Sequence, residues 1–297
     1  MNPEDQEDWR DEALDFILVA IAKDHELNEC LIFKGARLMH GRVSTMRRRS
    51  LDIDATIAHD PKPPGATPVE TAAWFEAKFK ATIRLAADAE VPIRYGLEAL
   101  SVTPSPKRTH PHGWQGFSVR VNFVDRRQPS RLGNPALTID LAATEHLGPK
   151  AIETILLRDV SLHAYSIARQ TAEKLRAILQ SLPAYRLKLG SREQSVRVKD
   201  IADLSNILND HPLAEDDFWE TVATEFVAAC RDRLVDCAGW DSFAEEKDVT
   251  ERAYSSDATL QKEKSFNEAW TALASITSEL ERRGLFPISN PLPKTES

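Results

Sequence analysis

Two aspartates, Asp52 and Asp54, stand one residue apart at the start of a short β-forming run, Asp-Ile-Asp-Ala-Thr-Ile. In a strand, alternate side chains point to the same face, so the two carboxylates would lie side by side while Ile53 points into a core. Neighbouring carboxylates repel each other unless a cation lies between them. A hard divalent ion with oxygen ligands, most simply Mg²⁺, suits this arrangement, so the pattern predicts a magnesium site.

A Lys-Gly pair, Lys34 and Gly35, follows a short apolar strand, and its glycine lies seventeen residues before Asp52. Glycine lets a backbone approach a ligand closely, and the amides that open a following helix can bind phosphate. Each motif alone is common in proteins without such a ligand. Their order and spacing, a phosphate turn and then a carboxylate pair, indicate a nucleotide-handling site.

These residues resemble the nucleotidyltransferase superfamily built on the DNA polymerase beta fold, and more narrowly the AbiEii/MenT toxins of type IV toxin–antitoxin systems. That family carries an apolar-Lys-Gly-Gly turn and then Ser-x-Asp-Ile-Asp, which match Phe33-Lys34-Gly35-Ala36 and Ser50-Leu51-Asp52-Ile53-Asp54. Ala36 departs from the pattern, because it replaces the second glycine and a positive φ would be costly there. The resemblance implies that Mg²⁺ is the cofactor and that nucleotide is bound by Lys34, Gly35, Ala36, Ser50 and Arg197.

A third acidic residue, Asp140, lies in a later predicted strand between Ile139 and Leu141. A single acid in an apolar strand is costly unless it has a partner. In polymerase-beta-type sites a third carboxylate on a later strand joins the first two, and Asp140 matches that role by residue type and order. The resemblance thus implies metal binding by Asp52, Asp54 and Asp140, the alternative being that Asp140 is a strand-end residue facing solvent.

Two further motifs of the family lie in the C-terminal half of the chain. An Ala-x-Lys segment is matched through Lys174, which in that family contacts the triphosphate. An Arg-x-x-Asp-x-x-Asp motif is matched by Arg197, Asp200 and Asp203, whose spacing of three places them along one helical face. Alone, these residues would indicate a solvated lysine and a surface salt bridge. With the N-terminal motifs, the resemblance implies that Asp52, Lys174 and Asp200 are catalytic, while Asp203 orients Arg197 or nearby backbone.

The composition limits the class of protein. A chain of 297 residues can bury a large core and divide into two domains, and 42% hydrophobic with 28% charged residues is ordinary for a globular protein. The net charge of −8 argues against a broad nucleic-acid-coating surface, although Arg47, Arg48 and Arg49 form a local basic patch. The chain has no apolar run of transmembrane length, no signal-peptide pattern and three cysteines, so we expect a cytoplasmic protein with no membrane partner.

Hydrophobic periodicity predicts the main elements. We expect helices over 8–28 and 69–90, and strands over Ile93–Leu100, Phe117–Phe123 and Ala136–Leu141. From residue 146 the composition becomes helical, starting with an amphipathic helix over 161–182, and 213–283 reads as three more helices. The predicted fold class is therefore α/β (α+β): a polymerase-beta-like nucleotidyltransferase domain with a mixed sheet over 1–145, a C-terminal helical domain over 146–285, and a tail over 286–297.

A hairpin loop over 103–116 carries His110 and His112. Two histidines in a Pro-rich loop are usually solvated rather than bound to a metal. Basic residues gather at the ends of the predicted strands, where they usually form a solvated rim but could line a channel for an acidic acceptor: Lys107, Arg108, Arg126, Arg127 and Arg131.

Taken together, the motifs predict a Mg²⁺-dependent nucleotidyltransferase toxin that works by two-metal in-line displacement, with pyrophosphate leaving an NTP. The resemblance implies an RNA acceptor, the 3′ end of tRNA, whose modification blocks translation, and a cognate antitoxin as a partner. Two alternatives stay open: a small-molecule nucleotidyltransferase of the antibiotic-modifying kind, and a non-catalytic nucleotide-binding protein. Phosphorylation of Ser50 would place an anion beside the carboxylates and disable the site, while the simpler expectation is a hydroxyl bonded to local backbone.

Overall fold

The computed structural model describes residues 3–44, 50–59, 61, 65–127, 134–190 and 196–293. The arginines at 47–49 and Arg131, which the sequence placed in basic clusters, lie outside these ranges. The chain forms two compact units. One, here called the sheet unit, comprises Met1–His40, Arg48–Glu145 and Glu153–Ala164, and the other, the helical unit, comprises Gly41–Arg47, His146–Ile152 and Tyr165–Ser297. The domain limits expected from the sequence stay a prediction.

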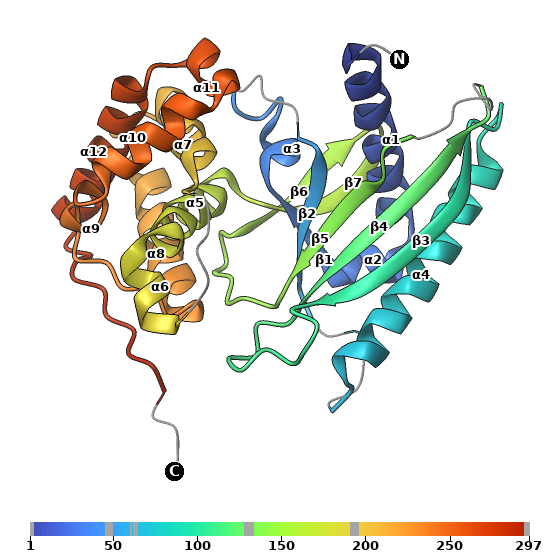
Figure 1. The fold of residues 1–297 in the computed structure, drawn as a ribbon, viewed down its shortest axis with the longest axis horizontal. Coiled ribbons are helices and arrows are strands. Elements are labelled where there is room, and N and C mark those ends of the chain that lie inside the picture. The colour runs from blue at the N-terminus through green and yellow to red at the C-terminus, as the bar shows by residue number, and fades with distance from the viewer. Residues whose placement is uncertain are drawn as a thin grey trace. The chain divides into compact units, whose positions relative to one another are not determined.

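Within the described residues, the strands join into one seven-stranded sheet with the order β3-β4-β5-β2-β1-β7-β6 (Figure 1). Its strands are β1 Leu31–Lys34, β2 Asp52–Ile57, β3 Tyr95–Ser105, β4 Gly116–Asp125, β5 Leu137–Ala142, β6 Ile152–Leu157 and β7 Val160–Tyr165. Strand β2 pairs antiparallel with β1 and parallel with β5, which makes the sheet mixed. This arrangement confirms the predicted fold class.

Helices α1 (Pro3–Lys23) and α4 (Pro68–Ala89) cover one face of the sheet (Figure 1). Phe75 of α4 packs on Phe117 of β4, with ring centroids 5.5 Å apart. Along β4, the residues that alternate with Phe117 are Ser118, Arg120 and Asn122, so the face turned away from α1 and α4 is polar. The sheet therefore has a buried apolar face and an opposite face that can carry charged groups.

The predicted helix over 8–28 is broken at Asp24. Its side chain accepts a hydrogen bond from the Leu27 amide (3.1 Å) and caps a second helix, α2 (His25–Cys30). Asp and Asn compete well as helix caps, which is why the chain starts a new helix there. The predicted helix over 69–90 is confirmed by α4, whose first turn is closed by a capping box between Thr67 and Glu70.

The expectation of helix from residue 146 onward is wrong for 152–165, which form β6 and β7. The expected helix over 161–182 starts later, as α5 (Ile167–Ser181), because the Ser166 hydroxyl accepts a hydrogen bond from the Arg169 amide (3.2 Å) and caps it there. The residues before this cap are extended because β7 pairs with β1, with Ala164 opposite Phe33.

The helical unit contains α5 and a series of further helices around a core that includes Trp219, Phe226 and Leu273. These helices are α6 Pro183–Leu189, α7 Val198–Asp210, α8 Asp216–Asp232, α9 Asp241–Ala244, α10 Lys247–Ser256, α11 Ala258–Glu263 and α12 Phe266–Arg282. The three helices expected over 213–283 are therefore five shorter ones in the described chain. Among the described residues, every helix is either too short or too polar to span a membrane.

Candidate active site

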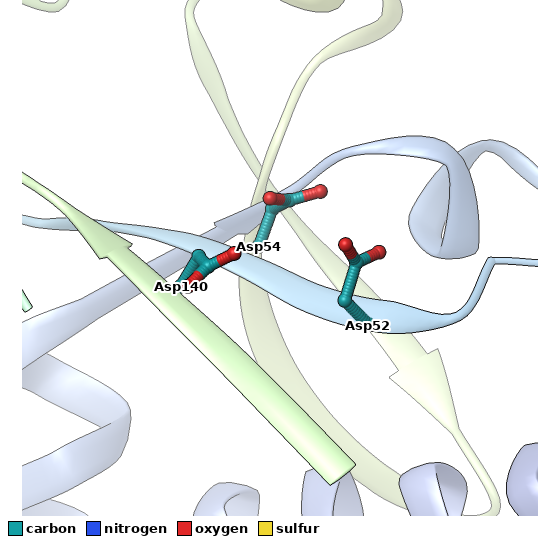
Figure 2. A group of neighbouring side chains, drawn as sticks. All are labelled: Asp52, Asp54 and Asp140. Atoms are coloured by element: carbon teal, nitrogen blue, oxygen red, sulfur yellow. The ribbon is translucent and has the colours of Figure 1, made fainter. Parts of the chain in front are cut away.

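Three aspartates meet on the polar face of the sheet (Figure 2). Asp52 and Asp54 project from β2, with buried Ile53 between them, and Asp140 projects from β5. Because β2 and β5 are parallel partners with Asp54 opposite Asp140, the register brings the third carboxylate beside the pair. One carboxylate oxygen from each residue lies within 4.8 Å of the others, which is the spacing of ligands around one ion. The structure thus joins the three aspartates that the sequence selected.

The charge at this site is crowded. Loss of water around the carboxyl raises the pKa of Asp140, and the negative charge of Asp52 raises it further, against a hydrogen bond with Ser118 that lowers it. Ser118 lies opposite Asp140 in the β4–β5 pairing, and sequence reasoning missed it. No sequence signal could have found it, since its role comes only from the register of two strands.

Four residues that pair across neighbouring strands form a row over the polar face of the sheet. Lys34 of β1 pairs with Asp54 of β2, which pairs with Asp140 of β5, which pairs with Ser118 of β4. Residues directly opposite in paired strands have neighbouring side chains. The predicted nucleotide-binding residue Lys34 is therefore a neighbour of the metal-binding candidates, and it supplies a positive charge on the β1 side of them.

The turn after β1 brings backbone into contact with the carboxylates. Gly35 has φ +86°, and a Cβ built on it would lie 2.2 Å from Asp54 Oδ2. The positive φ falls on Gly35 and not on Ala36, which begins the helix α3 (Ala36–Met39), so the alanine is tolerated where the family has its second glycine. Helix α3 is a single turn, so phosphate binding here would depend on the turn's own amides rather than on a helix dipole.

Ser50 and Arg37 hold the start of β2. The Ser50 hydroxyl donates to Asp52 Oδ1 (2.8 Å), and the Ser50 carbonyl accepts from Arg37 Nη2 (3.2 Å). Arg37 also pairs with Asp15 and Asp11 of α1, at 2.8 and 2.5 Å. These contacts fix the orientation of the Asp52 carboxylate. Sequence analysis selected Ser50 but missed Arg37, whose place in the single turn after Gly35 was the available signal.

In the helical unit, the residues of the later motifs form a buried ion cluster between α5 and α7. Lys174 Nζ donates to Asp200 Oδ1 (2.8 Å) and to Asp203 Oδ2 (2.6 Å), and Arg197 Nε donates to Asp200 Oδ2 (2.6 Å). Asp203 therefore contacts Lys174. Sequence analysis had expected it to orient Arg197 or nearby backbone.

In this cluster the opposite charges affect the pKa values more than burial does. Burial alone would raise the pKa of Asp200, but Lys174 and Arg197 hold it well below its usual range. Burial alone would lower the pKa of Lys174, but the two carboxylates raise it. Lys174 and Asp200 are therefore both charged at neutral pH, in a cluster that links α5 to α7.

Among the described residues, the hairpin histidines His110 and His112 do not belong to a group of three residues that could share an ion. Across the described part of the chain, Asp52, Asp54 and Asp140 are the only group of three acidic, His or Cys residues close enough to share an ion. The expectation that His110 and His112 are not metal ligands stays a prediction.

The fold resembles that of two solved structures from Helicobacter pylori. The chain is similar to the crystal structure of JHP933 from Helicobacter pylori, with a TM-score of 0.52, 14% identity and coverage of 92% of each chain. It is also similar to a provisionally assigned nucleotidyltransferase from H. pylori, with a TM-score of 0.50, 14% identity and coverage of 90% of this chain and 92% of that one. At this identity the likeness concerns the fold alone. No curated protein matches the chain.

Residues 17–282 match the family described as nucleotidyl transferase AbiEii toxin, type IV toxin–antitoxin system. Since the match spans most of the chain, this protein belongs to the AbiEii family and is a nucleotidyltransferase toxin. The resemblance expected from the Lys-Gly turn and the Asp-Ile-Asp strand is confirmed.

Proposed function

We propose that the protein transfers a nucleotidyl group from an NTP to the 3′ end of tRNA, in a Mg²⁺-dependent reaction that blocks translation in the cytoplasm. The observation that carries the proposal is the meeting of Asp52, Asp54 and Asp140 beside the Gly35 turn within one compact unit. Membership of a type IV toxin family supports an NTP substrate, a cognate antitoxin and a target needed for growth.

The three aspartates fit a divalent metal by their chemistry. All the donors are carboxylate oxygens, the ligand type that hard cations such as Mg²⁺ prefer. Burial raises the pKa of Asp140 and the charge of Asp52 raises it further, and a bound cation would favour the ionised carboxylates. When bound there, Mg²⁺ would supply Lewis-acid activation of an acceptor hydroxyl and neutralise charge on the triphosphate.

The protein's own groups would hold the two reactants. Asp52, fixed by Ser50, and Asp54 would keep the metal-bound face in one orientation. The amides of Gly35 and Ala36 would bind the triphosphate from the β1 side, with Lys34 as a nearby cation. An acceptor hydroxyl would then attack the α-phosphorus from the opposite side, with pyrophosphate leaving toward the turn.

We assign a supporting role to the buried cluster of the helical unit. An ammonium has three N–H donors, and the described contacts of Lys174 engage two of them with Asp200 and Asp203. The third donor could bind a phosphate oxygen, while Asp200 positions Lys174 and also holds Arg197. Lys174 is only 7% exposed, so its contribution would depend on this fixed geometry rather than on a mobile side chain.

The test is incubation of the protein with each labelled NTP, Mg²⁺ and either total RNA, purified tRNA or an aminoglycoside mixture. We expect label on tRNA only, pyrophosphate release, and loss of both in Asp52→Ala but not in Asp88→Ala. Asp88 is the matched control because it is an exposed aspartate on α4 of the same unit. Label on aminoglycosides alone would contradict the RNA acceptor, and full activity of Asp52→Ala would contradict the site.

A further inference from the structure

Three aromatic rings gather on the loop between β3 and β4, residues 106–115. The ring centroids of His110, His112 and Trp114 lie 4.9 to 5.8 Å from one another, and all three residues are half-buried. Lys107 and Arg108, both exposed, stand in the same loop. Aromatic faces with adjacent cations are the composition of surfaces that bind single-stranded nucleic acid.

The loop is anchored next to the strand that carries Asp140. The Gln115 side chain closes it by donating to the Pro106 carbonyl (2.9 Å), and Gly116 then packs so tightly on β5 that a Cβ there would lie 2.6 Å from the Leu141 carbonyl oxygen. Ser118, two residues further, lies opposite Asp140. Trp114 is four residues from Ser118, so along the chain it is at most about 13 Å from the level of the carboxylates.

The loop lies on the side from which an acceptor would have to come. Gly35 follows β1, on one side of β2. Asp140 lies on β5 and the loop leads into β4, and both of these strands lie on the other side of β2. In-line displacement requires the attacking and leaving oxygens to lie on opposite sides of the phosphorus. If the triphosphate occupies the Gly35 turn, the acceptor strand must therefore approach across β5 and β4.

The polar face continues this path. The exposed residue Arg120 lies on β4 opposite Thr138 of β5, and Thr138 in turn lies opposite Asp52 of β2. It gives the face a cation on the β4 side of the carboxylates, at the level of Asp52 and two residues beyond Ser118 as seen from the loop, although the whole chain carries a net charge of −8. A polyanion can thus be drawn to this face by local charge.

We propose that His110, His112 and Trp114 form a base-stacking site for the single-stranded 3′ end of the RNA acceptor, with Lys107 and Arg108 on its phosphates. The stacking site rests on the proposed function, and it adds the path that the RNA strand would take and the number of unpaired nucleotides that it would need. At about 3.4 Å for each stacked nucleotide, a span of about 13 Å corresponds to roughly four nucleotides. The terminal hydroxyl would sit at the carboxylates, and a base about four nucleotides upstream would stack on the loop.

Binding is tested without turnover, by fluorescence anisotropy of a labelled eight-nucleotide RNA on protein carrying Asp52→Ala. We expect Trp114→Ala to weaken binding about 5- to 100-fold for every base composition, because stacking is sequence-tolerant, and Trp114→Phe to keep most of it. Thr109→Ala, an exposed change in the same loop, is the matched control and should bind normally. Lys107→Gln with Arg108→Gln should lower the slope of log Kd against log salt by about 1.4, at roughly 0.7 for each phosphate.

Unchanged RNA affinity in Trp114→Ala of normal melting temperature would overturn the proposal. So would unchanged RNA affinity together with lost binding of the cognate antitoxin, because the loop would then be a protein interface. If Trp114→Ala does not fold, His110→Ala with His112→Ala is measured in its place, with the same expected loss.

The second measurement uses active protein and hairpin RNAs with 3′ overhangs of one to eight nucleotides. We expect the KM for the RNA to fall sharply once the 3′ overhang reaches about four nucleotides. In Trp114→Ala this drop in KM should disappear, while kcat is kept. A drop that persists in Trp114→Ala would overturn the stacking site but leave the transferase intact. Absence of transfer to any RNA, with normal loop-dependent binding, would overturn the proposed transfer to RNA but leave the stacking site.

Discussion

At the residue scale, Gly35 is the position where backbone and carboxylate come closest. A side chain there would meet Asp54 Oδ2 at 2.2 Å and would also be strained at φ +86°. We expect Gly35→Ala to lower pyrophosphate release at least 100-fold, since the carboxylate or the turn must move. Gly41 is a matched control, because it has nearly the same φ, +82°, but an added Cβ would meet no described residue within 4 Å.

The comparison between the two glycines separates strain from contact. Both alanine variants should lose unfolding free energy from the positive φ, by about 1–3 kcal/mol at Gly35, where φ +86° with ψ −177° is a conformation essentially restricted to glycine. Only Gly35→Ala should lose activity. Equal activity of the two variants, measured at saturating NTP and Mg²⁺, would show that Asp54 does not need its present orientation.

Ser50 is the residue through which a charge change would reach the site most directly. Its hydroxyl donates to Asp52 Oδ1 at 2.8 Å and to the Asp52 carbonyl at 3.1 Å. Ser50→Ala removes these hydrogen bonds, and we expect a loss of activity of about tenfold or less. Ser50→Asp places a carboxylate against Asp52, and we expect a loss of more than 100-fold with a higher Mg²⁺ requirement.

A Mg²⁺ titration of activity in the three proteins checks this prediction. Normal activity of Ser50→Asp at low Mg²⁺ would mean that an anion at this position is tolerated. In that case phosphorylation of Ser50 could not switch the enzyme off through repulsion.

At the element scale, the contact between α5 and α7 depends on charges held in a buried cluster. Removing one member of a buried ion pair commonly costs about 3 kcal/mol, so Asp200→Asn should unfold more easily than the natural protein at pH 7. The pKa of Asp200 is lowered in the folded state, so its stabilising effect is present above the unfolded pKa near 3.8 and is lost as pH falls through the lower folded value.

The stability difference between the natural protein and Asp200→Asn should therefore be constant from pH 7 to about 5 and shrink below about pH 4. Melting temperatures measured from pH 7 to 2.5 check the sign. A difference that grows as the pH falls would mean that Asp200 is not held ionised by Lys174 and Arg197.

The limits of sequence reasoning are also clearest at the element scale. Strand β6 is an edge strand with mostly exposed residues, so it shows no buried alternation that would distinguish it from the helix that follows. The turn from β7 into α5 did carry a signal, the serine cap at Ser166, but the apolar residues on both sides were consistent with one long helix. Asp24 similarly ends α1 by capping α2, and tertiary contacts with Lys78 and Thr82, which hold this carboxylate, are invisible in a local pattern.

At the scale of the whole molecule, the fold class and the metal-binding candidates could be predicted because they depend on short motifs in a fixed order. The resemblance grouped Asp140 with Asp52 and Asp54 by residue type, strand and order, and the structure pairs it with Asp54, although 86 residues separate the two in the chain. Ser118 and the aromatic loop could not be ranked this way. Their importance comes from the register that sets β4 beside β5, and neither residue pattern is distinctive without it.

The three clustered carboxylates that suit metal binding should also lower the stability of the protein when no metal is bound. Asp52, Asp54 and Asp140 are held together in the fold, and like charges across paired strands destabilise a sheet by about 0.5 kcal/mol. The natural protein should therefore be less stable without Mg²⁺ than Asp140→Asn, whose amide oxygen can still accept from Ser118. With a unit of this size, the melting temperature of Asp140→Asn should be about 1–2 °C higher.

Mg²⁺ should reverse that order. At a concentration ten times the dissociation constant, a bound ion stabilises the folded state by about 1.4 kcal/mol, which raises the melting temperature by about 3–6 °C. The natural protein should gain this shift and Asp140→Asn should not, so the two melting curves should cross as Mg²⁺ is added. Because the carboxylates belong to the sheet unit alone, any second unfolding transition should stay unmoved. Parallel responses of both proteins to Mg²⁺ would mean that Asp140 takes no part in binding the ion, whatever its distance from Asp52 and Asp54.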